Sequence, residues 1–323
     1  MRWIKLIVLL VLSAVGARAA ELFDCIPEQA ALAVRMRTAR FFAAEPLRAL
    51  TESGDVSRIR EELALIPWDG GLPDAVLLYF GATQSYAVLV ECRTEPEELK
   101  RKILRKYEKN PNVSLRQLTE RGFPVLRLSF TRPDKPGRIK NYDLVRLADD
   151  VVLMAGNRNP TPWEALDRRY SSAMGRQLRQ APEALLLFGV CDDPGKLGID
   201  PLGMTRRMRS FSFSVFADAG RGIELAAEVQ GTDSAAAQGL NTQFTLFSRL
   251  LFGAFFGAYP DLMRRCSSAV KLTVQQETLH LSANFSPETL AEIRTCYVND
   301  SDRFNRTLES SLISGGSGKN EKK

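Results

Sequence analysis

The stretch VKLTVQQETLHLSANF, residues 270 to 285, alternates apolar and polar side chains along nearly its whole length. Successive side chains of an extended chain point to opposite faces, so the pattern predicts two strands, over 270–275 and 279–285, each with one buried face. Residues 223–230 show the same alternation. Sheets with one apolar and one polar face are typically antiparallel, so the pattern favours hairpins over a doubly wound parallel sheet.

Further elements are predicted on both sides of this stretch by the same periodicities. The rest of the second half predicts a strand over 184–190, a short helix near 203–208, a strand over 211–217, a long helix over 233–265 and a last helix over 287–297. The first half predicts strands over 31–36, 75–80 and 86–92, a helical region over 38–65 that breaks at Pro46 and Gly54, a helix over 96–109, strand pairs around Gly122 and around 148–150, and a helix over 160–178.

The order strand, helix, hairpin, helix, hairpin, helix therefore occurs twice, at a spacing of roughly 155 residues. We expect an α+β fold of two pseudo-repeated halves, each an antiparallel sheet with helices packed on one face. The polar, glycine- and lysine-rich end of the chain predicts a disordered tail. The expected boundaries are 1–19 for a signal peptide, 20–180 and 181–298 for the two halves, and 299–323 for the tail.

The N-terminus has the three parts of a secretory signal peptide. Arg2 and Lys5 give a positive start, and an apolar run of about ten residues follows, which is too short to span a bilayer. Residues 17–19 read Ala-Arg-Ala, which fits the cleavage rule, so we expect cleavage between Ala19 and Ala20. The sequence thus predicts a periplasmic or secreted protein.

A Pro-Glu pair opens each half, at Pro27-Glu28 before the strand at 31 and at Pro182-Glu183 before the strand at 184. With the export signal and the repeated order of elements, this chain resembles a group of uncharacterised secreted bacterial proteins that have two duplicated α+β halves. That group has no established activity, so the resemblance implies a fold and an exported location but no functional residues.

The charge of the mature chain excludes one class of partner. Cleavage would remove Arg2, Lys5 and Arg18 and lower the net charge from +6 to +3. This charge is too small and too scattered to indicate nucleic-acid binding. The densest basic run, Arg206 to Arg209, is compatible with contact to an anionic membrane surface, and a solvated face is the plainer interpretation.

Residues that could carry chemistry are few. His280 is the single histidine of the chain, on the polar side of a predicted strand. No nucleophile elbow, phosphate loop, calcium loop or C-x-x-C occurs, so the sequence indicates no catalytic residue, cofactor or metal site. The adjacent acids at 149–150 and 192–193 fit turns, where aspartate stabilises the bend.

Five cysteines remain after export, at positions 25, 92, 191, 266 and 296. Export permits disulfides, and an odd number leaves at least one thiol over. Cys266 and Cys296 each follow a predicted helical stretch and are the best candidates for a disulfide. The alternative is that all five are small buried hydrophobic residues.

The most unusual stretch is FTLFSRLLFGAFFGAY, residues 244–259. Phe244, Phe247, Leu251 and Phe255 follow helical spacing on one face. A helix buried between the two halves is the plainest interpretation. The alternatives are an interface with a partner or a second copy of the chain, and the wall of a pocket for a lipid-like ligand.

These observations support three functional hypotheses. The first is an exported, non-enzymatic binding or envelope-associated protein, with an envelope protein or a hydrophobic ligand as its partner. The second is a hydrolase of envelope or extracellular polymers that uses dispersed carboxylates, which would need a cleft with two carboxylates about 5–10 Å apart. The third is a carrier of a lipid-like ligand, which would need an apolar cavity beside Phe247 and Phe255.

Overall fold

The computed structural model describes residues 22–48, 54–120, 122–131, 139–156, 172–198, 200 and 203–299. The chain divides into two compact units. Unit 1 contains residues 1–39 and 54–182, and unit 2 contains residues 40–53 and 183–323. The segment 40–53, which the sequence analysis assigned to the first half, is thus part of unit 2. The fold is α+β, as predicted.

Unit 1 has an antiparallel sheet with the strand order β1-β2-β3-β7-β6-β5-β4. Every pair of neighbours in this order is antiparallel. The strands are β1 (Leu32–Met36), β2 (Ala75–Phe80), β3 (Ser85–Glu91), β4 (Val113–Glu120), β5 (Phe123–Thr131), β6 (Ile139–Ala148) and β7 (Val151–Gly156). The predicted strands at 31–36, 75–80 and 86–92 and the strand pairs around Gly122 and 148–150 agree with these bounds.

The predicted helical region at 38–65 breaks at both expected places. It consists of α2 (Thr38–Ala43), a 3-10 turn η1 (Glu45–Leu47) and α4 (Gly54–Ala64). Of these, α4 belongs to unit 1 and η1 to unit 2, and the boundary of the units falls within α2. The other helices of unit 1 are α5 (Pro96–Tyr107) and α6 (Ser172–Gln180). The first part of the helix predicted over 160–178, residues 160–171, lies outside the described residues.

Helices contact both faces of the sheet of unit 1. The Tyr86 hydroxyl of β3 donates a hydrogen bond to Glu62 of α4. Arg35 of β1 points to the opposite face, by the strand register, and donates to the Leu178 carbonyl oxygen at the end of α6. Helices therefore cover both faces of the sheet of unit 1. The expectation that helices pack on one face is wrong for this unit, because α6 lies on the face opposite to α4.

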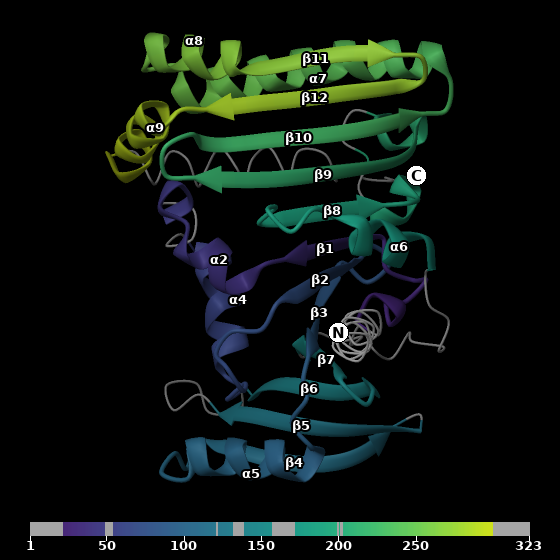
Figure 1. Cartoon of the computed structure of the whole chain (residues 1–323), viewed down its shortest axis with the longest axis vertical. Helices are drawn as coiled ribbons and strands as arrows, with labels where there is room; N and C mark the ends of the chain where they lie inside the picture. Colours follow the sequence, from purple (N-terminus) through teal and green to yellow (C-terminus); the bar gives the residue numbers. More distant parts are fainter. Residues whose placement is uncertain are drawn as a thin grey trace, which may run out of the picture. The chain divides into compact units, whose positions relative to one another are not determined.

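Unit 2 has an antiparallel sheet with the order β8-β9-β10-β12-β11. Its strands are β8 (Leu187–Cys191), β9 (Met208–Asp218), β10 (Gly222–Gly231), β11 (Val270–Gln275) and β12 (Thr278–Phe285). The alternating stretch 270–285 forms the hairpin β11–β12, as predicted. Helices α7 (Ser234–Phe256) and α8 (Pro260–Ala269) pack on one side of this sheet (Figure 1). Val229, Leu272 and Leu279 of the sheet cluster with Leu240 of α7.

One prediction for this unit is wrong. Residues 233–265 form two helices, not a single long one, because the chain leaves the helix at Gly257 and restarts at Pro260. Proline lacks the backbone N–H that a helix interior needs, whereas the first turn of a new helix tolerates it. The last helix, α9 (Pro287–Asn299), begins where predicted, and the short turn η5 (Thr205–Arg207) replaces the helix expected near 203–208.

The connections of the two sheets follow the same order. Three antiparallel strands come first, a helical segment then crosses to the far edge of the sheet, and the chain returns strand by strand until it pairs with the third strand. The return takes four strands in unit 1 and two in unit 2. This likeness is topological, and a repeat in the sequence itself stays a prediction.

Candidate functional site

Helix α7 is fixed at its start by a side-chain cap and by a buried inner face. The Asp233 carboxylate accepts a hydrogen bond from the Ala236 N–H at 2.7 Å, which satisfies one of the backbone donors that a helix start leaves open. Leu240 is fully buried and belongs to a cluster with Val229 and Leu279 of the sheet, against which Phe244 packs. The N-terminal half of α7 is therefore anchored on the sheet of unit 2.

The outer face of α7 is exposed and apolar. Leu246 and Leu250 are 54% and 59% exposed, whereas most large apolar side chains of a folded protein are buried. Arg249 lies beside them and is also exposed. It is the single charged residue of the 23-residue helix, which contains no acid. We call Leu246, Arg249 and Leu250 the outer face of α7.

The C-terminal half of α7 meets α8 and α9 in a second hydrophobic cluster. Its buried members are Phe256, Leu262, Cys266 and Cys296. Partly buried apolar residues surround it, namely Phe252, Phe255, Tyr259, Met263, Phe285 and Ile293. The rings of Phe252 and Phe256 stack with their centroids 6.3 Å apart. We call this the α7–α9 cluster.

An open groove lies above this cluster, between α8 and α9. It encloses about 820 Å³ of empty space, part of it open solvent. Its apolar lining comes from Ala258, Tyr259, Pro260, Leu262 and Cys296. Its polar lining comes from Asp261, Arg265, Glu292 and Thr295. We call it the α8–α9 groove.

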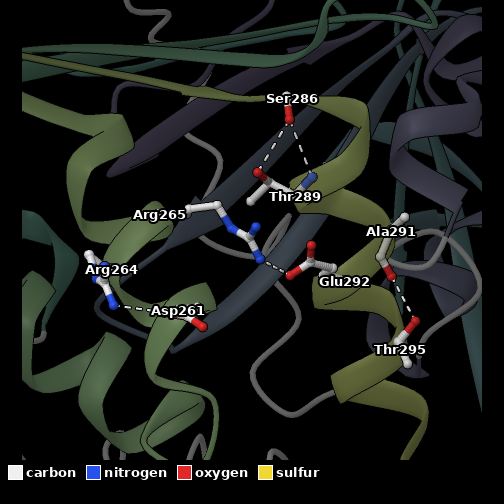
Figure 2. A network of polar contacts seen from close by, with 8 residues as sticks. All are labelled: Asp261, Arg264, Arg265, Ser286, Thr289, Ala291, Glu292 and Thr295. Carbon is white, nitrogen blue, oxygen red and sulfur yellow. Dashed lines mark hydrogen bonds and ion pairs between the residues drawn. The ribbon is translucent and has the colours of Figure 1, made fainter.

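A set of polar contacts holds the two helices that border the groove. Arg265 of α8 and Glu292 of α9 form an ion pair between the helices, and their side chains point toward one another in Figure 2. Asp261 and Arg264 pair within α8 at 2.7 Å. The lining of the groove therefore contains one ion pair that joins its two helices.

The start of α9 explains how this helix is positioned. The Ser286 hydroxyl accepts a hydrogen bond from the Thr289 N–H at 3.3 Å, and Pro287 occupies the first helical position (Figure 2). A hydrogen bond with the Ser286 hydroxyl lowers the pKa of the Glu288 carboxyl below its ordinary value. The sequence Ser-Pro-Glu-Thr thus sets the point at which α9 begins beside the groove.

The cysteines are buried thiols in this structure. Burial raises the pKa of Cys266 to about 11 and that of Cys191 to about 12. Cys266 and Cys296, the predicted disulfide partners, belong to the same α7–α9 cluster, and Cys296 also lines the groove. The structure therefore brings these two residues together, and the disulfide between them stays a prediction.

The predicted aromatic face of α7 is distributed over two clusters. Phe244 packs on the sheet cluster and Phe255 on the α7–α9 cluster, while Phe247 is half-buried between them. Leu251 is part of α7, but its side chain lies outside the described part of the structure. The exposure of Leu246 and Leu250 shows that α7 is not buried on all sides, in contrast to the plainest interpretation of its sequence.

Other residues singled out by the sequence fall elsewhere. Ala19 and Ala20 lie outside the described residues. His280 pairs with Thr273 in the sheet and lies on its polar face, with its Nδ1 atom 3.5 Å from Glu228 Oε1.

The α8–α9 groove is the feature that the sequence analysis missed. Its lining residues come from the segment between α7 and α8, from α8 and from α9, and they form no recognisable motif. The signals present in the sequence were Pro260, which ends one helix and starts another, and the cysteines of α8 and α9. In the described ranges we find no helix long and apolar enough to cross a membrane and no group of three or more potential metal ligands.

Comparisons with known proteins give little further information. No family model and no curated protein matches this chain. The chain is similar to the solved structure of TP0453 in crystal form I, with 8% sequence identity, a TM-score of 0.42, and coverage of 83% of this chain and 94% of that one. Crystal form IV of TP0453 gives 9% identity, a TM-score of 0.40, and coverage of 82% and 92%. At this level the likeness supports no functional argument.

Proposed function

We propose that this chain is an exported binding protein of the bacterial envelope and that the α8–α9 groove is its binding site. The observation that carries the proposal is the groove itself. The part of this space that water-sized molecules can occupy is about 470 Å³, which lies within the range of about 300–1,000 Å³ that is typical of binding pockets. Its walls combine apolar side chains with a few polar groups, which is the usual composition of such sites.

The open shape of the groove favours a protruding segment of a partner protein over an enclosed small ligand. Tyr259 and Pro260 offer an apolar surface, and aromatic residues are enriched where proteins bind one another. The Arg265–Glu292 ion pair at the rim can exchange one of its hydrogen bonds for a backbone group of the partner. The site therefore fits a partner segment that presents an apolar side chain flanked by polar backbone groups.

The hydrolase hypothesis receives less support from the same groove. Two of its lining residues, Asp261 and Glu292, carry carboxylates. Each is already engaged by an arginine, Arg264 and Arg265 respectively. Both carboxylates of the described lining are therefore already held in ion pairs within the protein, which leaves none of them unengaged for a substrate. A carrier of a lipid-like ligand would need a cavity beside Phe247 and Phe255, and neither of these residues lines the groove.

The test is to fill the groove and measure what the protein retains. Thr295 is exposed on α9 and lines the groove, so Thr295→Trp adds bulk there without changing the core. Thr119→Trp, at an exposed position of β4 in unit 1, is the matched control. The affinity-tagged proteins are isolated from the envelope fraction, and the molecules that accompany them are identified by mass spectrometry.

We expect one envelope component to be retained by the wild-type protein and by Thr119→Trp, and to be lost from Thr295→Trp. The same component retained by all three proteins would contradict the assignment of the groove. The intact mass of the exported protein tests the location separately, because cleavage after Ala19 predicts a mature chain that begins at Ala20.

A further inference from the structure

The outer face of α7 is an exposed apolar surface that the proposed binding site does not use. Leu246 and Leu250 are among the most exposed large apolar residues of the described chain, at 54% and 59%. They are four residues apart, so they lie above one another on the same side of the helix. Neither lines the α8–α9 groove.

Positive charge continues this face toward the start of α7. Gly239 lies seven residues before Leu246, on the same side of the helix. A Cβ atom at Gly239 would lie 2.5 Å from Nη1 of Arg207, so the guanidinium of Arg207 rests against the helix at this point. Arg249 lies between the two leucines on the exposed surface.

The cations of this surface are poorly balanced by acids. In the described part of the chain no ion pair involves Arg207 or Arg249. Arg206 is 89% exposed and 3.5 Å from Asp200, and a surface pair of this kind is weak. Helix α7 itself contains no acidic residue; the acids near its start are its N-cap Asp233 and Glu277, and Glu277 is paired with Arg209. The surface therefore combines two exposed leucines with a net positive charge.

We propose that the outer face of α7, together with Arg207, docks the protein onto an anionic lipid surface. Interfacial helices bind by inserting apolar side chains among the lipids while cations contact the anionic headgroups. The charge complementarity selects this occupant over a second copy of the chain, because Arg249 and Arg207 lie beside the two leucines and would oppose a like-charged copy. The inference rests on the proposed export to the envelope, but not on the assignment of the groove.

The test measures sedimentation of the purified protein with vesicles of phosphatidylglycerol and phosphatidylcholine, and with vesicles of phosphatidylcholine alone. We expect binding to the anionic vesicles that weakens with added salt, and at least tenfold weaker binding to the neutral ones. The double variant Leu246→Gln/Leu250→Gln should bind the anionic vesicles at least tenfold more weakly. Arg207→Gln and Arg249→Gln should each weaken binding about fivefold.

Leu104→Gln is the matched control, because Leu104 is 50% exposed on α5 of unit 1 and should be replaceable without effect. All substituted side chains are at the surface, so the urea midpoints should stay unchanged. No binding to anionic vesicles, or an equal loss in Leu104→Gln, would overturn the proposal. So would self-association that the double leucine variant abolishes without any vesicle binding. Thr295→Trp should bind vesicles normally, which separates this inference from the function of the groove.

Discussion

Glu62 shows how a single buried charge is accommodated in unit 1. It is 6% exposed, and its carboxylate accepts hydrogen bonds from Tyr86, Tyr142 and Lys140 at 3.0 to 3.3 Å. A buried charge that loses its partners is costly, whereas a satisfied one is tolerated. The cluster therefore ties α4 to β3 and β6 and specifies how the helix packs on the sheet.

Glu62→Ala should lower the free energy of unfolding by about 3 kcal/mol, because it leaves Lys140 and two tyrosine hydroxyls without their shared acceptor. Glu61→Ala, at the exposed neighbouring position, should change it by less than about 0.5 kcal/mol. Urea unfolding followed by circular dichroism measures both. Equal effects of the two variants would contradict the structural role of Glu62.

The buried thiols should be chemically inert in the folded protein. The pKa of Cys266 is raised to about 11, so at pH 8 only about one thiol in a thousand is ionised, and the thiolate is the reactive form. In protein kept reduced, so that a disulfide between Cys266 and Cys296 does not block the reaction, iodoacetamide should therefore modify Cys266 and Cys191 slowly in the native state and rapidly in urea, as measured by mass spectrometry. Complete modification of the folded protein within minutes would be incompatible with their burial.

Asp69 and Lys102 offer a test by pH. The hydrogen bond from Lys102 lowers the pKa of the Asp69 carboxyl, with a second contribution from Thr94, and the same contact raises the pKa of Lys102. The stabilisation from Asp69 is thus present above its unfolded pKa of about 3.9 and is lost as the pH falls through the lower, folded value. The stabilisation from Lys102 is lost as the pH rises through its raised pKa.

Lys102→Met should move the pKa of Asp69 back toward its ordinary value, because it removes the hydrogen bond that lowers this pKa most, while the hydrogen bond from Thr94 stays. An NMR titration of the Asp69 carboxyl carbon measures the shift. An unchanged midpoint in Lys102→Met would mean that Lys102 does not hold this carboxylate in solution.

At the scale of elements, the strands were more predictable than the helices. The period-2 pattern located β11 and β12 within one residue, because a half-buried strand repeats its environment at every second position. The two helices α7 and α8 were predicted as one. Apolar residues continue through the junction, so the hydrophobic pattern contains no break, and the break is visible only from the backbone preferences of Pro260.

Glycines in two elements should respond oppositely to substitution. A Cβ atom at Gly253 of α7 would meet no atom within 4 Å, so Gly253→Ala should stabilise the protein by about 0.5–1 kcal/mol through helix propensity. A Cβ atom at Gly189 of β8 would lie 2.2 Å from the Phe213 ring, so Gly189→Ala should destabilise it by about 1–3 kcal/mol. Urea midpoints decide both, and a stabilising Gly189→Ala would mean that Phe213 does not pack over β8.

At the scale of the whole molecule, the candidate site was not predictable from the sequence. The groove takes Tyr259 from the segment before α8, Arg265 from α8 and Glu292 from α9. No local pattern links these positions, because the site depends on how two helices diverge above a shared cluster. The predicted disulfide between Cys266 and Cys296 was the one hypothesis from the sequence that linked α8 with α9. It was based on the position of each cysteine after a predicted helical stretch.

The central claim is that the α8–α9 groove binds a partner in the envelope. The most direct measurement places a photoreactive side chain at Thr295 in the exported protein and illuminates intact cells. We predict a single covalent adduct from Thr295, absent when the same side chain replaces Thr119, and competed away by excess unlabelled wild-type protein. Adducts of equal yield from both positions, or no adduct from Thr295, would contradict the claim.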